Sequence, residues 1–204
     1  INRTSPKTQS ALLEVMEEQQ VTVDGVTHPV PQPFIVLATQ NPGEFVGTYP
    51  LPEAQMDRFL MKISMGYPEK EEELAILRRS ADAAPANLSA VISLEEIVAL
   101  KKKVEHIHIS PRLEEYIVNL AEATRDSEYI RLGVSPRGSL ALHRTARAYA
   151  VLCGRDYVLP DDIKFLAPFV LTHRIIISPK GKSVLGSPEE VLAQLLRTLT
   201  VPTE

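Results

Sequence analysis

Three polar side chains, Asn41, Arg58 and Arg137, stand where they could act on a phosphate group. Asn41 follows the apolar run 34–40, and an amide at the end of a strand can orient a water or contact a phosphate oxygen without adding charge. Arg58 closes a short predicted helix, from which a guanidinium can stabilise charge that develops on a transferred phosphoryl group. Arg137 stands in the first turn of another predicted helix, where free N–H groups already favour anions.

Each of the three residues also has an ordinary structural alternative that its spacing leaves open. Asn41 can cap a turn, and Arg58 can pair with Glu53 or Asp57 close by in the sequence. Arg137 can be a solvated surface charge, as most exposed arginines are. Taken singly, these structural roles outweigh the chemical ones.

Two predicted strands and a hairpin would position the first of these residues. Residues 34–38 are continuously apolar rather than alternating, which is typical of a strand buried on both faces of a parallel sheet. Residues 60–65 alternate weakly and predict a second strand. Two β-branched runs at 21–28 flank Asp24-Gly25, a pair that tolerates positive φ, and predict a β-hairpin.

Helices account for most of the rest of the chain. Hydroxyl N-caps followed by Pro, a Ser-x-x-Glu capping box and acidic first turns mark where they begin. They predict helices at 6–20, at 50–59, from 69, from 93, at 111–126, from 135, from 160 and from 188. The core positions predicted in the helix from 135 are Leu140, Leu142, Ala146, Tyr149, Ala150 and Leu152.

The composition narrows the class of protein. The 204 residues are 44% hydrophobic and carry a net charge of −4, which argues against wholesale neutralisation of a nucleic-acid backbone. The single cysteine, Cys153, excludes an internal disulfide, fits a reducing cytoplasm and is expected to be buried. No apolar run approaches the roughly 20 residues of a membrane span. His106 and His108 are too few for a metal site, so no metal ligands are predicted.

The three candidate residues belong to two longer motifs. The run "ATQNP…GTYPLPEAQMDRF" at 38–59 and the run "GVSPRGSLALHRTARAYAVLCGRDYVLPDDIK" at 133–164 resemble the MoxR-type AAA+ ATPases. The likeness covers most of the chain and is strongest over 1–80 and 130–175. It implies an α/β partial AAA+ core, with parallel-sheet strands and a β-hairpin, followed by an all-α helical lid.

The resemblance implies a role for each candidate residue. Asn41 matches sensor 1, which positions the lytic water against the γ-phosphate of ATP. Arg58 matches the arginine finger, which acts on the nucleotide of a neighbouring subunit. Arg137 matches sensor 2, the lid arginine that reads the nucleotide state, and the subunit whose nucleotide it contacts is left open.

The resemblance also implies an organisation and partners. The C-terminal half of the nucleotide-binding core is expected over 1–66, a connecting helix and linker over 67–90, and a helical lid domain over 91–204. The expected protein is a cytoplasmic ring, a hexamer, that uses ATP and Mg²⁺ for chaperone-like remodelling or assembly of client proteins. Clients with von Willebrand factor A-type domains are among those implied, whereas nucleic acid is not.

The sequence departs from the family in one large respect. It contains no G-x-x-x-x-G-K-[ST] phosphate loop, and "PKGKS" at 179–183 has Ile176 where the first glycine should stand, so it is expected to be a surface turn. In family members, the acidic pair that serves Mg²⁺ and the water stands immediately before the "INR" with which this sequence begins. We therefore expect an N-terminally truncated piece that is inactive by itself, although its parent is an ATPase.

A second class of function stays open, that of a non-catalytic helical protein-interaction module that retains an AAA+ fold. The missing phosphate loop favours it for the chain alone, whereas the presence of Asn41, Arg58 and Arg137 together argues against it. Remodelling of nucleic acid is disfavoured because the hairpin tip, Asp24-Gly25, offers no cation to a phosphate backbone.

Overall fold

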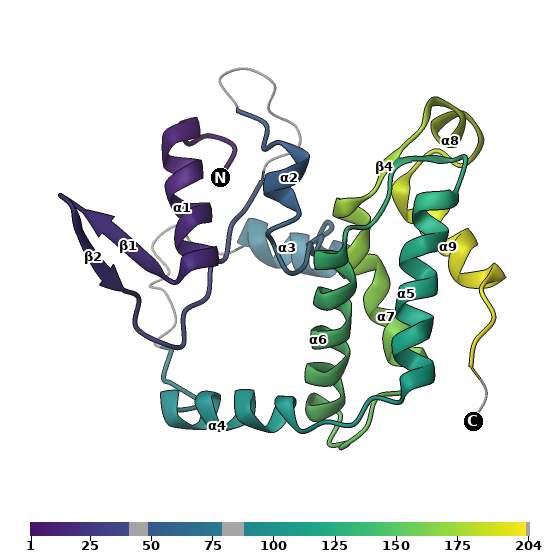
Figure 1. Ribbon diagram of the computed structural model, residues 1–204. Helices are drawn as coiled ribbons and strands as arrows, with labels where there is room; N and C mark the ends of the chain where they lie inside the picture. The colour runs from purple at the N-terminus through teal and green to yellow at the C-terminus, as the bar shows by residue number, and fades with distance from the viewer. Residues whose placement is uncertain (41–48, 79–87, 203–204) are drawn as a thin grey trace.

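The computed structural model describes residues 1–40, 49–78 and 88–202. Figure 1 shows an N-terminal part that holds a helix, a β-hairpin and two short helices, and a C-terminal part that is almost entirely helical. Helix α4 (Leu94–Glu105) runs from the N-terminal side to the end of the helical part (Figure 1). The division at 66–67 and 90–91 stays a prediction.

The chain begins with helix α1 (Pro6–Glu18), as predicted. Ser5 caps this helix, because its Oγ accepts from the backbone N–H of Thr8 at 3.3 Å. Gln9 is buried on the helix and its Nε2 donates to the carbonyl of Tyr49 at 3.1 Å. Helix α1 is therefore tied to the segment that leads into the next helix.

A β-hairpin follows helix α1, also as predicted. Strand β1 (Gln20–Val23) pairs antiparallel with strand β2 (Val26–Pro29). Asp24 has a φ of 51° and Gly25 a φ of 78°, the positive values that a two-residue turn of this kind requires. The aspartate–glycine signal in the sequence thus identified the turn correctly.

The segments 34–38 and 60–65 are not strands, and in this respect the sequence prediction is wrong. Neither segment pairs with a strand in the described ranges, and Ile35, Leu37 and Met65 are 78%, 88% and 95% exposed. Among the described residues the strand pairs are antiparallel, β1 with β2 and β3 with β4. An apolar strand is buried when neighbouring strands and helices cover it, and the described chain pairs no strand with either segment. Of the two segments, only Met61 packs against the core, where the N–H of Lys62 donates to the carbonyl of Phe169 at 2.8 Å.

Two short helices follow in the N-terminal part, α2 (Glu53–Met56) and α3 (Lys70–Arg78). Both were predicted, but α2 is shorter than the expected 50–59. The acidic first turn of α3, which contains Glu71, Glu72 and Glu73, suits the positive end of the helix dipole.

The C-terminal part contains most of the regular structure. After α4 its elements are α5 (Pro111–Asp126), β3 (Ile130–Leu132), α6 (Pro136–Leu152), α7 (Pro160–Leu171), η1 (Thr172–Arg174), β4 (Ile176–Ile177), α8 (Pro179–Val184) and α9 (Pro188–Thr198). A serine N-cap followed by a proline begins four of these helices, with Ser110, Ser135, Ser178 and Ser187 as the caps. No helix in the described ranges is long and apolar enough to cross a membrane.

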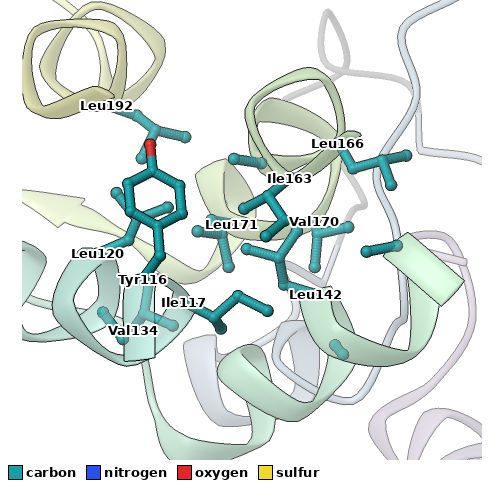
Figure 2. Packing of buried hydrophobic residues seen from close by; sticks show 14 of the residues in the cluster. Tyr116, Ile117, Leu120, Val134, Leu142, Ile163, Leu166, Val170, Leu171 and Leu192 are labelled. Carbon is teal, nitrogen blue, oxygen red and sulfur yellow. The ribbon is translucent and has the colours of Figure 1, made fainter. Parts of the chain in front are cut away.

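The hydrophobic core lies where helices α5, α6, α7 and α9 meet. Figure 2 shows Leu120, Leu142, Ile163 and Leu192 converging there. Each of these four side chains is fully buried, which stabilises the fold by roughly 1.5–3 kcal/mol per side chain relative to exposure. Tyr116 points its hydroxyl toward Leu192 (Figure 2), and burial raises the pKa of this hydroxyl.

The predicted core face of helix α6 is only partly correct. The structure buries three of the predicted positions, Leu142, Ala146 and Ala150. Leu140 is 47% exposed because it lies two residues before Leu142, on the other side of the helix. Leu152 and Cys153 are exposed although Ala150 is fully buried and Val151 packs against the core, because successive residues of a helix point to different sides. The prediction of a buried thiol is therefore wrong. Tyr149 packs against Phe165, with ring centroids 5.2 Å apart.

The "PKGKS" sequence forms the short helix α8 rather than the expected turn. Gly181 is buried there, and a Cβ at this position would lie 2.2 Å from the carbonyl oxygen of Tyr129. Lys180 lies over the Tyr129 ring and pairs with Glu128 at 2.6 Å. The glycine therefore serves close packing, and no strand–loop–helix frame for phosphate surrounds it.

Candidate functional site

Arg58 and Arg137 meet at one carboxylate, that of Glu17 at the end of helix α1. Arg58 Nη1 donates to Oε2 of Glu17, and Arg137 Nη2 lies 2.5 Å from Oε1. The site is open to solvent, since the side chains of Arg58 and Glu17 are each 31% exposed and that of Arg137 is 47% exposed. Figure 1 shows α2 between α1 and the start of α6. Asn41, the third candidate, lies outside the described residues.

Arg58 is positioned by the turn that follows helix α2. Its backbone N–H donates to the carbonyl of Gln55 at 3.2 Å, and the N–H of Asp57 donates to that of Glu53 at 3.0 Å. The sequence offered Glu53 or Asp57 as its partner, but the structure gives Glu17 instead. The contact was not predicted, because nothing local in the sequence connects the end of one helix to a residue on another.

Arg137 is positioned by the N-terminus of helix α6. Ser135 caps the helix, accepting from the N–H of Gly138 at 3.4 Å, and Pro136 occupies the first turn. This end of the helix favours negative charge, so an arginine placed on it strengthens an anion site. The Ser135 hydroxyl also donates to Oδ2 of Asp57 at 2.9 Å, which connects the helix cap to the residue beside Arg58.

Asp57 also holds the buried arginine Arg174, which sequence reasoning missed. Arg174 Nε donates to Oδ1 of Asp57 at 2.8 Å, and the Arg174 side chain is only 2% exposed. Its Nη2 donates to the carbonyl of Phe59 at 2.6 Å, and its Nη1 to that of Leu60 at 3.3 Å. Arg174 therefore binds both the carboxylate before Arg58 and the backbone after it.

Burial and neighbouring charges act on Arg174 in opposite directions. Burial lowers the pKa of its guanidinium, the negative charge of Asp57 opposes this, and the positive charge of Arg137 adds to it. The sequence contained no signal for this residue beyond a histidine–arginine pair at the end of a helical pattern. A buried arginine of this kind is recognised only when the carboxylate that compensates it is known.

His173 lies against the same guanidinium. Its Nε2 is 2.7 Å from Arg174 Nη1 and 3.1 Å from the carbonyl oxygen of Phe59, so this nitrogen accepts from the arginine when it carries no proton and donates to Phe59 when it does. Burial and the charge of Arg174 lower the pKa of His173 to about 4, so the ring is neutral near pH 7. His173 is therefore a neutral contact of Arg174 near pH 7 rather than a second cation beside it.

Three of the four remaining histidines have structural contacts, and the fourth, His28, is exposed on strand β2. His106 ends helix α4, the backbone of His108 bonds to Asp156, and His143 lies 3.3 Å from Glu114. Within the described parts of the chain, no group of three or more His, Cys, Asp or Glu residues is placed to hold a metal ion. The described residues thus include anion-binding groups but no ligand set for Mg²⁺.

Known proteins resemble this chain along its whole length. Residues 1–61 match the ATPase family associated with various cellular activities (AAA), and residues 122–195 match the AAA lid domain. The uncharacterised protein YeaC of Bacillus subtilis is 50% identical over 205 residues, which cover 100% of this chain. Chaperone MoxR1 of Mycobacterium tuberculosis is 41% identical over 211 residues, which cover 99% of it.

A solved structure shares the fold. It is a presumed ATPase from Cytophaga hutchinsonii, with a TM-score of 0.89 and 40% identity over 99% of this chain. The chain spans 64% of that protein, 64% of YeaC and 56% of MoxR1. These comparisons confirm the predicted fold class, a partial AAA+ core followed by a helical lid. The chain, with its arginines on the core and on the lid, belongs to the MoxR family of AAA+ ATPases.

Proposed function

We propose that this chain supplies the trans-acting arginines of a MoxR-type ATPase. Arg58 and Arg137 together bind the terminal phosphate of an ATP molecule that a neighbouring subunit holds. The observation that supports this proposal is their shared contact with the Glu17 carboxylate. Two guanidinium groups that reach one anion within a subunit are also placed to reach one phosphoryl group at its surface.

The shared carboxylate supports action of Arg137 in trans rather than in cis. In a ring built from head-to-tail contacts, each subunit has two different faces. Arg58 and Arg137 both contact Glu17, so they lie on the same face. If Arg58 reaches the neighbour's nucleotide as an arginine finger, Arg137 does so as well. Asn41, as sensor 1 at the end of a core segment, would then serve the nucleotide of its own subunit.

The chemistry asked of the two arginines is charge stabilisation. A guanidinium presents a planar fork of donors that matches two oxygens of a phosphoryl group. An arginine supplied in trans contributes about 10³–10⁵-fold to kcat in phosphoryl transfer. Mg²⁺ would neutralise charge on the β- and γ-phosphates, but the described residues offer no ligand set that fits it.

The chain is proposed to be inactive alone. Its sequence has no phosphate loop, so it lacks the backbone cradle that ATP binding requires in this class. We expect negligible ATPase activity and very weak ATP affinity from the 204-residue chain. Calorimetric titration with Mg-ATP tests this, and micromolar binding would contradict it.

The wider role is that of the family. We propose that a polypeptide of the relatives' full length forms a cytoplasmic ring, a hexamer, and couples ATP hydrolysis to remodelling or assembly of client proteins. Clients with von Willebrand factor A-type domains are the class to test first. Support comes from the name of MoxR1, which is described as a chaperone.

Replacing Arg58 in the full-length protein tests the arginine-finger role. Arg58→Ala should lower kcat by about 10³-fold or more and change ATP affinity little, because a finger acts in the transition state. Arg144→Ala, which changes an exposed arginine on helix α6, is the matched control. If Arg58→Ala kept full turnover but lost ATP binding, the assignment would be wrong. If Arg58→Ala changed neither kcat nor ATP affinity, the result would favour the alternative of a non-catalytic interaction module.

A further inference from the structure

The ion pairs of Glu17 connect helix α1 to the turn after helix α2 and to helix α6, but they contribute little to stability. An ion pair between partly exposed side chains contributes about 0–1 kcal/mol to stability. The two segments that carry Arg58 and Arg137 are already joined by Asp57, which binds Ser135 and the buried Arg174. The contacts of Glu17 are therefore not needed to hold these segments together.

The Glu17 carboxylate occupies the position between the two arginines that a larger anion could occupy. Its two oxygens are shared out, Oε2 to Arg58 and Oε1 to Arg137. A terminal phosphoryl group likewise offers several oxygens on one atom to a pair of guanidinium groups. In this state the two arginines face a carboxylate of their own subunit, which lowers the positive charge that an incoming phosphate meets from +2 to +1.

We propose that Glu17 is a displaceable carboxylate that occupies the arginine pair and competes with the phosphate for it. The inference rests on the proposed function, because it needs Arg58 and Arg137 to be a phosphate site. Glu17 acts through these two residues and is a positioning residue. Glu17 stays bound to Arg58 and Arg137 until an anion of higher charge replaces it. The two arginines therefore bind a phosphate group only when the nucleotide of a neighbouring subunit comes within reach.

The competition predicts that removing the Glu17 charge tightens anion binding. The probe is inorganic tripolyphosphate, which carries the charge of the ATP phosphates without the nucleoside. Glu17→Gln keeps the shape of the side chain but removes its charge, so the 204-residue chain should bind tripolyphosphate about tenfold more tightly by calorimetry. Glu14→Gln, on the same helix and also exposed, makes the same change in net charge and should alter the affinity less than about twofold.

Substitutions of the arginines separate the two proposals. Arg58→Ala and Arg137→Ala should each weaken tripolyphosphate binding, and either should cancel the gain from Glu17→Gln. If the arginine variants weaken binding but Glu17→Gln tightens it no more than Glu14→Gln does, the displacement proposal is wrong and the proposed function stands. If no arginine substitution changes binding, or no variant binds the probe, the displacement proposal is wrong, whereas the proposed function is overturned only if full-length Arg58→Ala keeps its kcat.

Stability and NMR provide readouts that do not depend on affinity. Glu17→Gln should leave the unfolding midpoint close to that of the unmodified chain, and loss of folding would show a structural role and overturn the proposal. The guanidinium Nε–H signals of Arg58 and Arg137 should be ordered in the unmodified chain. They should broaden in Glu17→Gln and reappear when tripolyphosphate is added, whereas signals that Glu17→Gln leaves unchanged would contradict the proposal.

Discussion

Arg174 lies buried against Asp57, with Nε 2.8 Å from Oδ1, although one residue follows helix α7 and the other precedes Arg58. The same carboxylate accepts from the hydroxyl of Ser135, two residues before Arg137. A single buried ion pair therefore joins the core segment to the helical part and fixes the spacing between the two arginines that face Glu17.

The first prediction concerns the contribution of the Asp57–Arg174 ion pair to stability. Asp57→Asn keeps the shape of the side chain but leaves Arg174 buried without a compensating charge. Breaking a buried pair in this way should cost about 3–5 kcal/mol of the free energy of unfolding. Equilibrium unfolding in urea measures the loss.

The exposed pair Lys180–Glu128, at 2.6 Å, is the matched control for this measurement. Lys180→Ala should cost no more than about 1 kcal/mol, because solvent screens the pair. If Asp57→Asn were no more destabilising than Lys180→Ala, the Asp57–Arg174 ion pair would not hold the segment after helix α2 against the helical part.

The second prediction concerns pH and His173. Burial lowers its pKa in the folded state to about 4, below the ordinary value of 6.5, so the unfolded chain takes up this proton first as pH falls. The stability that the neutral ring contributes is thus present above about pH 6.5 and is lost between 6.5 and 4, up to about 3 kcal/mol. His173→Gln should flatten the pH dependence of the unfolding free energy over this window.

The exposed hairpin histidine His28 is the control for the pH series. His28→Gln should leave the slope between pH 6.5 and 4 as it is in the unmodified chain. An unchanged slope in His173→Gln would show that other groups carry the acid sensitivity of the fold. Arg174, Lys62 and Asp57 are the charged groups that act on His173, so their substitution should move the window.

The third prediction concerns the packing beneath Arg137. A Cβ at Gly138 would lie 2.6 Å from Cγ1 of Val134 and 2.9 Å from Cδ of Arg174. Gly138→Ala should therefore destabilise the fold by about 1–3 kcal/mol and push Arg174 away from Asp57. Urea unfolding measures the loss, and Arg144→Ala on the same helix should stay within about 0.5 kcal/mol. If Gly138→Ala left the free energy of unfolding unchanged, the packing of Val134 and Arg174 against Gly138 would have room for a methyl group.

Local signals in the sequence predicted most of the helical elements. Serine–proline caps such as Ser135-Pro136 and the capping box at Ser93 act within one turn, so they can be recognised without knowledge of the fold. The hairpin was predicted for the same reason, because Asp24 and Gly25 satisfy a purely local requirement for positive φ. The conformation of such residues depends mainly on residues adjacent to them in the sequence.

Features that depend on distant partners were not predicted. The apolar run 34–38 has the composition of a buried strand, but burial requires neighbours that no local pattern specifies. Arg58 and Arg137 were singled out by their places at helix ends, and the resemblance then implied their roles. Glu17 and Arg174 were not predicted, because Glu17 contacts the two arginines from helix α1 and Arg174 contacts Asp57 from the segment after helix α7. A carboxylate near a helix end is too common to mark a site by itself.

The most direct test of the central claim is a subunit-mixing experiment with full-length Arg58→Ala and Arg137→Ala proteins. If both arginines act in trans from one face, every interface in a mixed ring lacks one of them, and the ATPase rate should stay as low as that of either variant alone. If Arg137 acted in cis, roughly a quarter of the interfaces in an equimolar mixture would be complete. Recovery of ATPase activity on mixing would therefore contradict a shared site on Arg58 and Arg137.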